Sequence, residues 1–472
     1  MTRAAAVGVI ACAAVAAVMR ADCPKCPAVA VPLYVKANAP APFTGGTLLA
    51  LIEQKAEASR LDRLVNGLWD LICGPGASTF ESAAAKLEKP FDDAVDELLR
   101  NEVSGGVRAQ SIGPPSFTCG TGSADRVFTR GGLRLIVSPL LRTKPAATVA
   151  PNGTEVCGNS ATDPCKILQR QLSRIGVIDA WRITKGDGVV VAVLDTGVAY
   201  RHPDLTDSMF VNAGAPTTDG TDGKYGYDAI HCSGDPDDVN SDGHGTHVAG
   251  IIAATQGNAF GGSGIAPHAG IMAVRVLGKG ATDDAVARGL RYVLKRQSAG
   301  ANVKVVNLSW TNDPPDVCTS LQYDLLDQLN SAGILVVAAA GNLNGDNDSD
   351  RTFPASYALP NVISVAACGE TSDERLCASN YGRRSVMLAA PGCNIFSTLP
   401  PDRYGRGSGT SMATAHVSGA SALLWSCNPG LSVGDVRTVL GNGVVSPYWS
   451  GNVSSNSRLS VDVAFSTVLG CH

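Results

Sequence analysis

Residues 189–197 read Val-Val-Val-Ala-Val-Leu-Asp-Thr-Gly, an uninterrupted apolar run that ends in a carboxylate. Continuous apolar runs of this length are typical of strands buried on both faces of a parallel sheet. Similar runs follow at residues 271–276, 303–308, 334–339 and 362–366, and helical patterns occupy residues 281–296, 320–331 and 411–425. This alternation predicts an α/β domain with a doubly wound, mostly parallel sheet and helices on both faces.

The composition is that of a globular protein with a large core. Of the 472 residues, 44% are hydrophobic and 17% are charged, which excludes a generally disordered chain. The formal net charge is −4, so binding to nucleic acid by neutralisation of phosphates is not expected. The length predicts about two or three domains, or one large domain with an extension.

The start of the chain is typical of an export signal. Arg3 precedes residues 4–18, an uncharged, alanine-rich run that is shorter than the roughly 20 residues of a membrane-spanning helix. We therefore expect a signal peptide at residues 1–21 and a secreted or otherwise extracytoplasmic protein, in the periplasm, at the cell surface or outside the cell. An N-terminal anchor, or a lipid on Cys12, is the alternative. No later stretch predicts a stable membrane span.

The cysteines agree with export. The chain has 14 of them, and disulfides are their default state in an exported protein. Removal of Cys12 with the signal leaves an odd number, so one thiol is expected to be free or paired with another chain. Two short-range disulfides are compatible with the spacing, Cys157–Cys165 and Cys368–Cys377.

The remaining sequence divides into three regions. Residues 22–166 combine helical spacing at 46–72 and 79–101 with a loop-like stretch at 105–164, in which residues 133–137 are the one strand-like run. Residues 167–445 carry the predicted α/β domain. Residues 446–472 are expected to be a C-terminal tail.

Three polar side chains lie at strand ends or helix starts of the α/β domain. Asp195 follows the first buried strand, where a partly desolvated carboxylate needs a partner such as an imidazole N–H. His244 lies in Asp-Gly-His-Gly-Thr-His, residues 242–247, near the start of an apolar helix. Ser411 lies in Gly-Thr-Ser-Met-Ala, residues 409–413, and opens a helix whose N-terminus favours a nearby oxyanion.

Each of these residues has a structural alternative. Asp195 is also suited to capping a turn, and Ser411 to capping a helix. His244 is also suited to a structural role, or to binding a metal together with His247, although a third ligand is missing. The three types in combination favour catalysis, because a hydroxyl nucleophile needs a base, and that base needs a carboxylate to fix its tautomer.

A fourth residue extends this interpretation. Asn342 follows the apolar run 334–339, and its amide can donate to a developing oxyanion, a contact worth about 3–4 kcal/mol of barrier. A turn residue with a left-handed backbone is the alternative. These residues together predict an acyl-transfer enzyme.

The motifs resemble those of the subtilisin-like serine peptidases, the subtilase or S8 family. Val-Leu-Asp-Thr-Gly, Gly-His-Gly-Thr-His-Val-Ala-Gly, Ala-Ala-Gly-Asn and Gly-Thr-Ser-Met-Ala occur in family order. The resemblance implies a subtilisin-like fold and a serine-type endopeptidase, a hydrolase of polypeptides that acts through an acyl-enzyme. It implies that Asp195 orients the base, His244 is the base and Ser411 is the nucleophile. Asn342 would be the oxyanion donor.

The resemblance also implies contacts with the substrate. Ser309, Trp310 and Gly341 would bind the substrate, the first of them at the end of a strand that pairs with the peptide backbone. Trp310 stands where a smaller residue is usual, and we expect it to narrow the pockets on the acyl side.

A structural calcium site is implied in the same way. Residues 258–267 resemble the calcium loop of the family, with Asp204, Asn258 and Gln169 as side-chain ligands. A solvated loop is the alternative. No cofactor is expected for the chemistry itself.

The stretch between Asp195 and His244 is acidic, and we interpret it as a solvated loop; selection of basic substrates and calcium binding are the alternatives. Its carboxylates are Asp219, Asp222, Asp228, Asp235, Asp237, Asp238 and Asp242.

The position of residues 22–166 favours a propeptide that keeps the enzyme a zymogen, with a cleavage site in a tether at about residues 139–167. A retained accessory domain is the alternative. For the whole protein the leading hypothesis is a secreted serine endopeptidase. A catalytically silent binding or scaffold protein of the same fold, with a blocked cleft, is the second hypothesis.

Overall fold

A computed structural model describes residues 163–471, apart from 213–222, 239–241, 280, 282, 314–318, 376 and 469, together with five short strands nearer the N-terminus. The signal peptide and the helices expected at 46–72 and 79–101 lie outside the described residues. The chain forms two compact units, Met1–Leu140 with Cys318–Leu321 and Leu141–Val317 with Gln322–His472. In the first unit, β1 (Val29–Ala30), β3 (Leu133–Pro139) and β2 (Arg126–Arg130) form an antiparallel sheet in that order.

The second unit is built on a large sheet, in which the described strands run in the order β16-β17-β13-β12-β11-β9-β6-β8-β7. All neighbours pair in parallel except β16 and β17. The strands are β6 (Val190–Asp195), β7 (Gly226–Asp228), β8 (Gly270–Arg275), β9 (Val303–Leu308), β11 (Leu335–Ala339), β12 (Val362–Gly369), β13 (Leu388–Cys393), β16 (Val444–Val445) and β17 (Ser457–Arg458).

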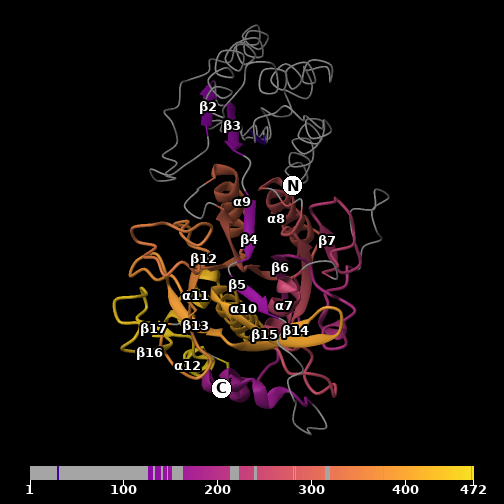
Figure 1. Cartoon of the computed structure of the whole chain (residues 1–472), viewed down its shortest axis with the longest axis vertical. Helices are drawn as coiled ribbons and strands as arrows, with labels where there is room; N and C mark the ends of the chain where they lie inside the picture. Colours follow the sequence, from indigo (N-terminus) through magenta and orange to yellow (C-terminus); the bar gives the residue numbers. More distant parts are fainter. Residues whose placement is uncertain are drawn as a thin grey trace. The chain divides into compact units, whose positions relative to one another are not determined.

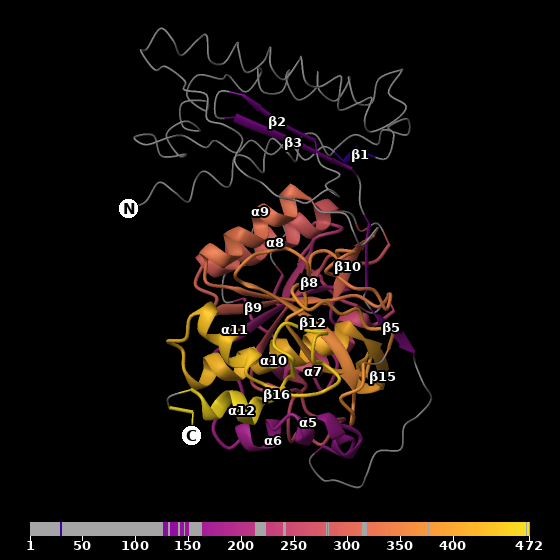
Figure 2. The ribbon, with the colours of Figure 1, turned by 90° about the vertical axis from the view of Figure 1, so that its left-hand side faces the viewer.

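Helices cover both faces of this sheet. Figure 2 shows α8 (Asp283–Ser298) and α9 (Ser320–Ser331) on one side, with α7 (His244–Ala253), α10 (Thr410–Cys427) and α11 (Val433–Gly441) on the other. This arrangement confirms the predicted α/β fold with a doubly wound sheet. Shorter helices are η2 (Lys166–Leu168), α5 (Arg170–Arg174), α6 (Val177–Ala180), η3 (Thr206–Ser208) and α12 (Val461–Ser466).

The strand order contains a reversal beside β6. From β6 the chain adds β8 on one side and then returns to add β9 on the other. In doubly wound sheets the crevice at such a reversal, beyond the carboxyl ends of the strands, is where ligands bind. Asp195 ends β6 and Leu308 ends β9, so the fold places these two strand ends beside each other at the reversal.

Two helices rich in small residues run through the core. Every residue of α7 is buried, and so is α10 from Thr410 to Trp425. Their glycine, alanine, serine and threonine side chains let α7 and α10 pack directly against each other and against the strands (Figure 1). Among the described helices, none combines the length and apolar character that a membrane crossing needs.

Two further antiparallel sheets lie at the edge of this unit. One pairs β10 (Trp310–Asp313) with β4 (Arg142–Pro145). The other has β15 (Arg403–Gly409) between β14 (Ile395–Leu399) and β5 (Ala147–Ala150). The interpretation of residues 105–164 as loop with a single strand is therefore wrong at β2, β4 and β5. The partners of β4 and β5 lie far along the chain, so the local pattern carries no sign of the pairing.

The C-terminal residues belong to the same unit. Trp449, Leu459 and Phe465 are buried, and α12 packs on α6. A disulfide joins Cys427, at the end of α10, to Cys471. Residues 446–472, separated as a tail in the sequence analysis, therefore contribute to the core.

A second disulfide joins Cys377 to Cys393. The expected pair Cys368–Cys377 is wrong, because the Cys368 thiol is free and buried in β12. Cys165 is disulfide-bonded, whereas Cys157 lies outside the described residues.

Candidate active site

The carboxylate of Asp195 and the imidazole of His244 are in direct contact. The carboxylate comes from the end of β6 and the imidazole from the first residue of α7, and His244 Nδ1 lies 2.7 Å from Asp195 Oδ1. The backbone N–H of Thr196 donates to the same oxygen at 2.8 Å. Because a carboxylate only accepts, the proton of the neutral imidazole lies on Nδ1, and Nε2 presents a lone pair.

The environment of His244 favours its charged form. Burial disfavours a positive imidazolium, but the Asp195 carboxylate outweighs this effect, and Asp242 and Asp238 add to it, so the pKa of His244 is raised above its usual value. His244 Nε2 is buried and has no hydrogen-bond partner among the described residues. The imidazole is therefore a base with an open position for a proton.

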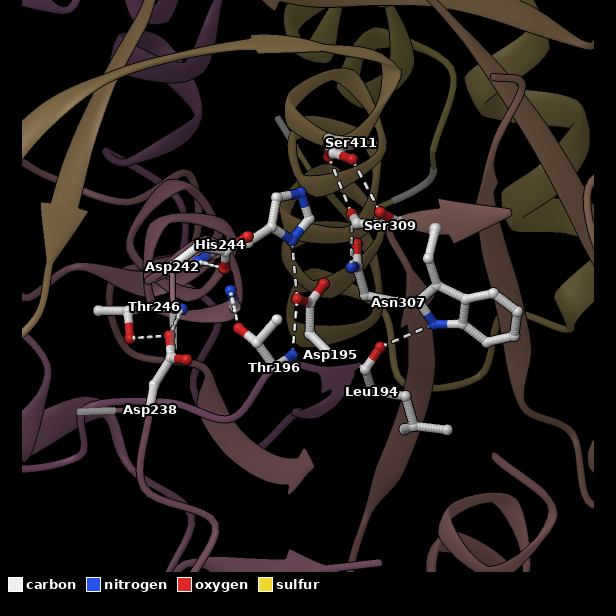
Figure 3. Close-up of polar contacts among 12 residues, drawn as sticks. Leu194, Asp195, Thr196, Asp238, Asp242, His244, Thr246, Asn307, Ser309 and Ser411 are labelled. Carbon is white, nitrogen blue, oxygen red and sulfur yellow. Dashed lines mark hydrogen bonds and ion pairs between the residues drawn. The ribbon is translucent and has the colours of Figure 1, made fainter. Parts of the chain in front are cut away.

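Ser411 is the second residue of α10 and lies in the same region as Asp195 and His244 (Figure 3). Its hydroxyl Oγ donates to the carbonyl of Ser309 at 2.7 Å, and Ser309 Oγ donates to the carbonyl of Ser411 at 2.9 Å. Ser309 directly follows β9, so this reciprocal pair ties the start of α10 to the end of that strand. The side chains of Asp195, His244 and Ser411 have no exposed surface.

Asn342 is held next to the start of α10. Its Oδ1 accepts from the Thr410 backbone N–H at 3.0 Å and from Thr410 Oγ1 at 3.1 Å. The N–H of Gly341 donates to the same hydroxyl at 3.1 Å. Because Oδ1 accepts from Thr410, the Asn342 amide is oriented by its oxygen. Its Nδ2 group makes no hydrogen bond with the described residues. Gly341 has φ +106° and a side chain there would meet Asn380, so glycine is required at this turn.

Of the predicted substrate contacts, Ser309 is hydrogen-bonded to Ser411 and Gly341 to its neighbour Thr410, but Trp310 differs from the expectation. The indole is fully buried and its N–H donates to the carbonyl of Leu194 at 2.9 Å. The indole is therefore held at the end of β6 and does not narrow a substrate pocket. Only the backbone of Trp310, the first residue of β10, is available for pairing with another strand.

His247 has a different environment from His244. Its Nε2 contacts the carbonyl of Gly405 in β15 at 3.2 Å, and burial lowers the pKa of His247 to about 3. The two histidines therefore do not form the metal-binding pair considered above. Within the described part of the chain, no three histidine, cysteine, aspartate or glutamate side chains form a group that would hold a metal ion.

The predicted calcium ligands lie close together. Asp204 Oδ1 accepts from Asn258 Nδ2 at 3.0 Å, and Asp204 Oδ2 accepts from the Gly262 N–H at 3.2 Å. Gln169 Oε1 accepts from the Ser263 N–H at 2.8 Å. Burial raises the pKa of Asp204 to about 6, against the effect of its hydrogen bonds. A cation would offset this cost of burial, so Asp204 fits a calcium ligand, whereas the amide oxygens of Gln169 and Asn258 are engaged by backbone N–H groups.

Sequence reasoning missed the role of two carboxylates near His244. Asp238 is fully buried and accepts from the Thr246 hydroxyl at 2.6 Å and the Thr246 N–H at 3.0 Å, and Asp242 accepts from the His244 N–H at 3.1 Å. The interpretation as a solvated loop residue is therefore wrong for Asp238, whereas Asp242 is exposed and lies in a loop, as expected, while its carboxylate also caps the helix. The available signal was the position of Asp242 two residues before the helix, where a carboxylate satisfies free N–H groups.

Comparisons with known proteins agree on one family. A model described as the Subtilase family matches residues 186–459. A thermophilic serine proteinase from Bacillus sp. (strain AK1) is 43% identical over 253 residues, which are 52% of this chain and 54% of that protein. Thermitase from Thermoactinomyces vulgaris is 38% identical over 272 residues, 57% of this chain and 85% of thermitase. Subtilisin BL from Lederbergia lenta is 37% identical over 281 residues, 58% of this chain and 91% of that protein.

A solved structure gives the same result. A protease from Pseudoalteromonas arctica PAMC 21717 superposes with a TM-score of 0.53 and 28% identity, covering 65% of this chain and 98% of that one.

Proposed function

The chain belongs to the subtilase family, and from this premise we propose that it cleaves polypeptides through Asp195, His244 and Ser411. It is a serine-type endopeptidase, as the similarity to serine proteinases and subtilisins indicates. The observation that supports the assignment of these residues is the contact between His244 Nδ1 and Asp195 Oδ1. This contact leaves His244 Nε2 without a hydrogen-bond partner among the described residues, in the site that also contains Ser411.

The reaction begins at the hydroxyl of Ser411. Its proton turns from the Ser309 carbonyl toward His244 Nε2, and Oγ attacks the carbonyl carbon of the substrate. Asp195 stabilises the resulting imidazolium and holds its ring in place. His244 then gives the proton to the leaving amine, and water repeats the sequence on the acyl-enzyme.

The oxyanion is assigned to the start of α10. Asn342 Nδ2 and the backbone N–H of Ser411 are the donors, and Thr410 holds the amide of Asn342 in place. The N-terminus of a helix adds a positive potential at the same position.

The second candidate function is a silent binding or scaffold protein. The full burial of Ser411 and His244 is the observation that favours it, because a substrate cannot reach a covered nucleophile. A fluorophosphonate probe separates the two. Labelling of the processed wild type and its loss in Ser411→Ala support catalysis; absence of labelling in processed, folded protein contradicts it.

A structural calcium ion at Asp204 is part of the proposal, with Asn258 and Gln169 offering the second lone pair of amide oxygens that already accept one backbone N–H each. Burial of the Asp204 carboxylate supports it. A ligand bound only to the folded state stabilises that state. Chelation of the Ser411→Ala protein is therefore expected to lower its melting temperature, and to have a smaller effect in the same protein with Asp204→Asn. An unchanged melting curve contradicts the calcium assignment.

Secretion, with removal of a signal peptide at residues 1–21, completes the proposal, together with a propeptide role for residues of the region 22–166. The uncharged, alanine-rich run at residues 4–18 and the disulfides of the α/β domain support an extracytoplasmic location. N-terminal sequencing of the exported protein tests both processing events.

A further inference from the structure

Asn380 is a buried residue that holds the loop on which the candidate oxyanion donor lies. This loop, residues 341–345, follows β11, and Asn342 lies in it between Gly341 and Leu343. The backbone N–H of Asn380 donates to the carbonyl of Gly341 at 2.8 Å, and Asn380 Oδ1 accepts from the N–H of Leu343 at 2.8 Å. These two groups belong to the peptide units on either side of Asn342. Asn380 therefore fixes the backbone of Asn342 from both sides.

The shape of the loop depends on the same side chain. Gly341 has φ +106° and Asn344 has φ +57°, so the chain changes direction twice within a few residues. The N–H of Gly345 also donates to Asn380 Oδ1, at 3.0 Å, beside that of Leu343. One carbonyl oxygen that accepts from both N–H groups fixes their spacing, and with it the course of the loop.

The nitrogen end of the Asn380 amide is engaged as well. Its Nδ2 donates to Asn347 Oδ1 at 2.9 Å and to Thr352 Oγ1 at 3.2 Å. Asn347 Nδ2 in turn donates to the carbonyl of Ala340, directly before the loop, at 2.9 Å. An asparagine amide has two donor hydrogens and two acceptor lone pairs, and Asn380 uses all four. Its amide can therefore take only this orientation without losing hydrogen bonds in a buried site.

The segment that carries Asn380 is itself attached to the large sheet. The hydroxyl of Ser379 accepts from the N–H of Ala367, in β12, at 2.8 Å. Cys377 is joined by its disulfide to Cys393, the last residue of β13. Asn380 thus connects the loop at residues 341–345 to two strands of the core.

We propose that Asn380 is a positioning residue for the oxyanion donor, which sets the backbone of Asn342 while Thr410 sets its side-chain amide. The proposal rests on the role of Asn342 given above and adds the group that holds it in place. The hydrogen bonds from Thr410 orient the amide, but the position of the Asn342 backbone depends on the loop. An oxyanion donor has to be in place before charge develops, and a displacement of about 1 Å can lower the rate by about 10²-fold.

A double-mutant cycle tests whether Asn380 acts through Asn342. Asn380→Ala is expected to lower kcat on a neutral peptide at least about tenfold, with KM changed by less than about twofold, because an oxyanion contact acts in the transition state. In the Asn342→Ala background the same change is expected to lower kcat by less than about twofold, because the donor that it positions is gone. Losses that multiply in full, or a wild-type kcat in folded Asn380→Ala, overturn the proposal.

Asn361→Ala is the matched control for the loss of a buried amide. Asn361 is fully buried, and its Nδ2 donates to the carbonyls of Leu326 and Ile334, at the other end of β11 from the loop. Both substitutions are expected to lower the melting temperature, but Asn361→Ala should leave the kcat of the folded enzyme unchanged. An equal loss of kcat in the two variants would mean that Asn380 acts through stability alone, and overturns the proposal.

Thr352→Val keeps the test decisive if Asn380→Ala does not fold. This change removes one of the two acceptors of Asn380 Nδ2 and leaves a side chain of similar size. We expect a smaller loss of kcat in the same direction, which again disappears in the Asn342→Ala background. An unchanged kcat, or a loss that persists undiminished without the Asn342 amide, contradicts the proposal.

Failure of this inference is distinguishable from failure of the proposed function. If the wild type reacts with the fluorophosphonate probe and hydrolyses the peptide, but the losses in the cycle multiply, the function stands and the role of Asn380 is wrong. If folded, processed wild type does not react with the probe, both are wrong.

Discussion

Asn342 illustrates how one side chain serves both structure and chemistry at the residue scale. Its amide oxygen accepts two hydrogen bonds from Thr410, and this fixes the direction of the amide nitrogen. An oxyanion donor acts only if it is already oriented when charge develops. The hydroxyl of Thr410 is thus part of the preparation of the site, although it contacts no substrate in the proposed reaction.

Replacement of Asn342 tests that role. Asn342→Ala is expected to lower kcat by about 10²–10³-fold with little change in KM, the loss that such a donor produces in this family. Asn342→Asp keeps the acceptor for Thr410 but removes the donor, and we expect a loss at least as large. If Asn342→Asp retained the wild-type kcat, the amide would act only by holding Thr410.

The pH dependence follows from the charges around His244. The imidazole acts as a base only when neutral, and Asp195, Asp242 and Asp238 raise its pKa above the usual value. Activity of the mature enzyme is therefore expected to be low in acid and to rise with pH through this raised pKa, as measured by kcat/KM on a neutral peptide. A flat profile from acid to neutral pH would exclude His244 as the base.

A single substitution checks the electrostatic cause. Asp242→Asn keeps an oxygen for the His244 N–H but removes the charge, so the acid limb of the profile should move to lower pH. Asp187→Asn changes a carboxylate that faces His268 at the surface and should leave the limb unmoved.

At the scale of elements, the position of α7 depends on β14. The hydroxyls of Ser397 and Thr398 donate to the carbonyls of His247 and Thr246, each at 2.8 Å. Gly250 allows this approach, because a Cβ there would collide with both hydroxyls. Since His244 is the first residue of α7, the same packing sets the position of the imidazole.

Gly250→Ala is therefore expected to lower the free energy of unfolding by about 1–3 kcal/mol, as in other overpacked cores. Urea unfolding in the Ser411→Ala background measures this without self-digestion. Gly434→Ala in α11 is the control, because the nearest atom to its Cβ is Ser432 Oγ at 3.7 Å and its backbone is helical. That change should be neutral or stabilising. Equal losses from the two substitutions would contradict the packing argument.

The elements themselves show what the sequence can predict. The bounds of β9 and α9 agree with the predicted runs 303–308 and 320–331, because a buried strand and an amphipathic helix leave clear apolar patterns. The strands β4 and β5 were missed, since their pairing depends on β10 and β15. Asp238 was misread for a similar reason: its partner Thr246 lies within another motif, and burial of a carboxylate leaves no local pattern.

At the scale of the whole molecule, the reversal of strand order beside β6 explains why the motifs gather. Asp195 ends β6 and Ser309 follows the neighbouring parallel strand β9, and α7 and α10 begin with His244 and Thr410, which contact these two strand ends directly or through the next residue. The motifs could be identified from their order along the chain. The distances between their side chains, the disulfide partners and the pairing of β4 and β5 required the three-dimensional structure.

The pairing of β4 with β10 and of β5 with β15 has a consequence for the kinetics of activity. A polypeptide from outside has to displace these strands before it can pair with β10 or β15, so casein hydrolysis is expected to begin after a lag. Samples taken over time in a casein assay measure this lag; hydrolysis at the full rate from the start would mean that the two strands leave freely.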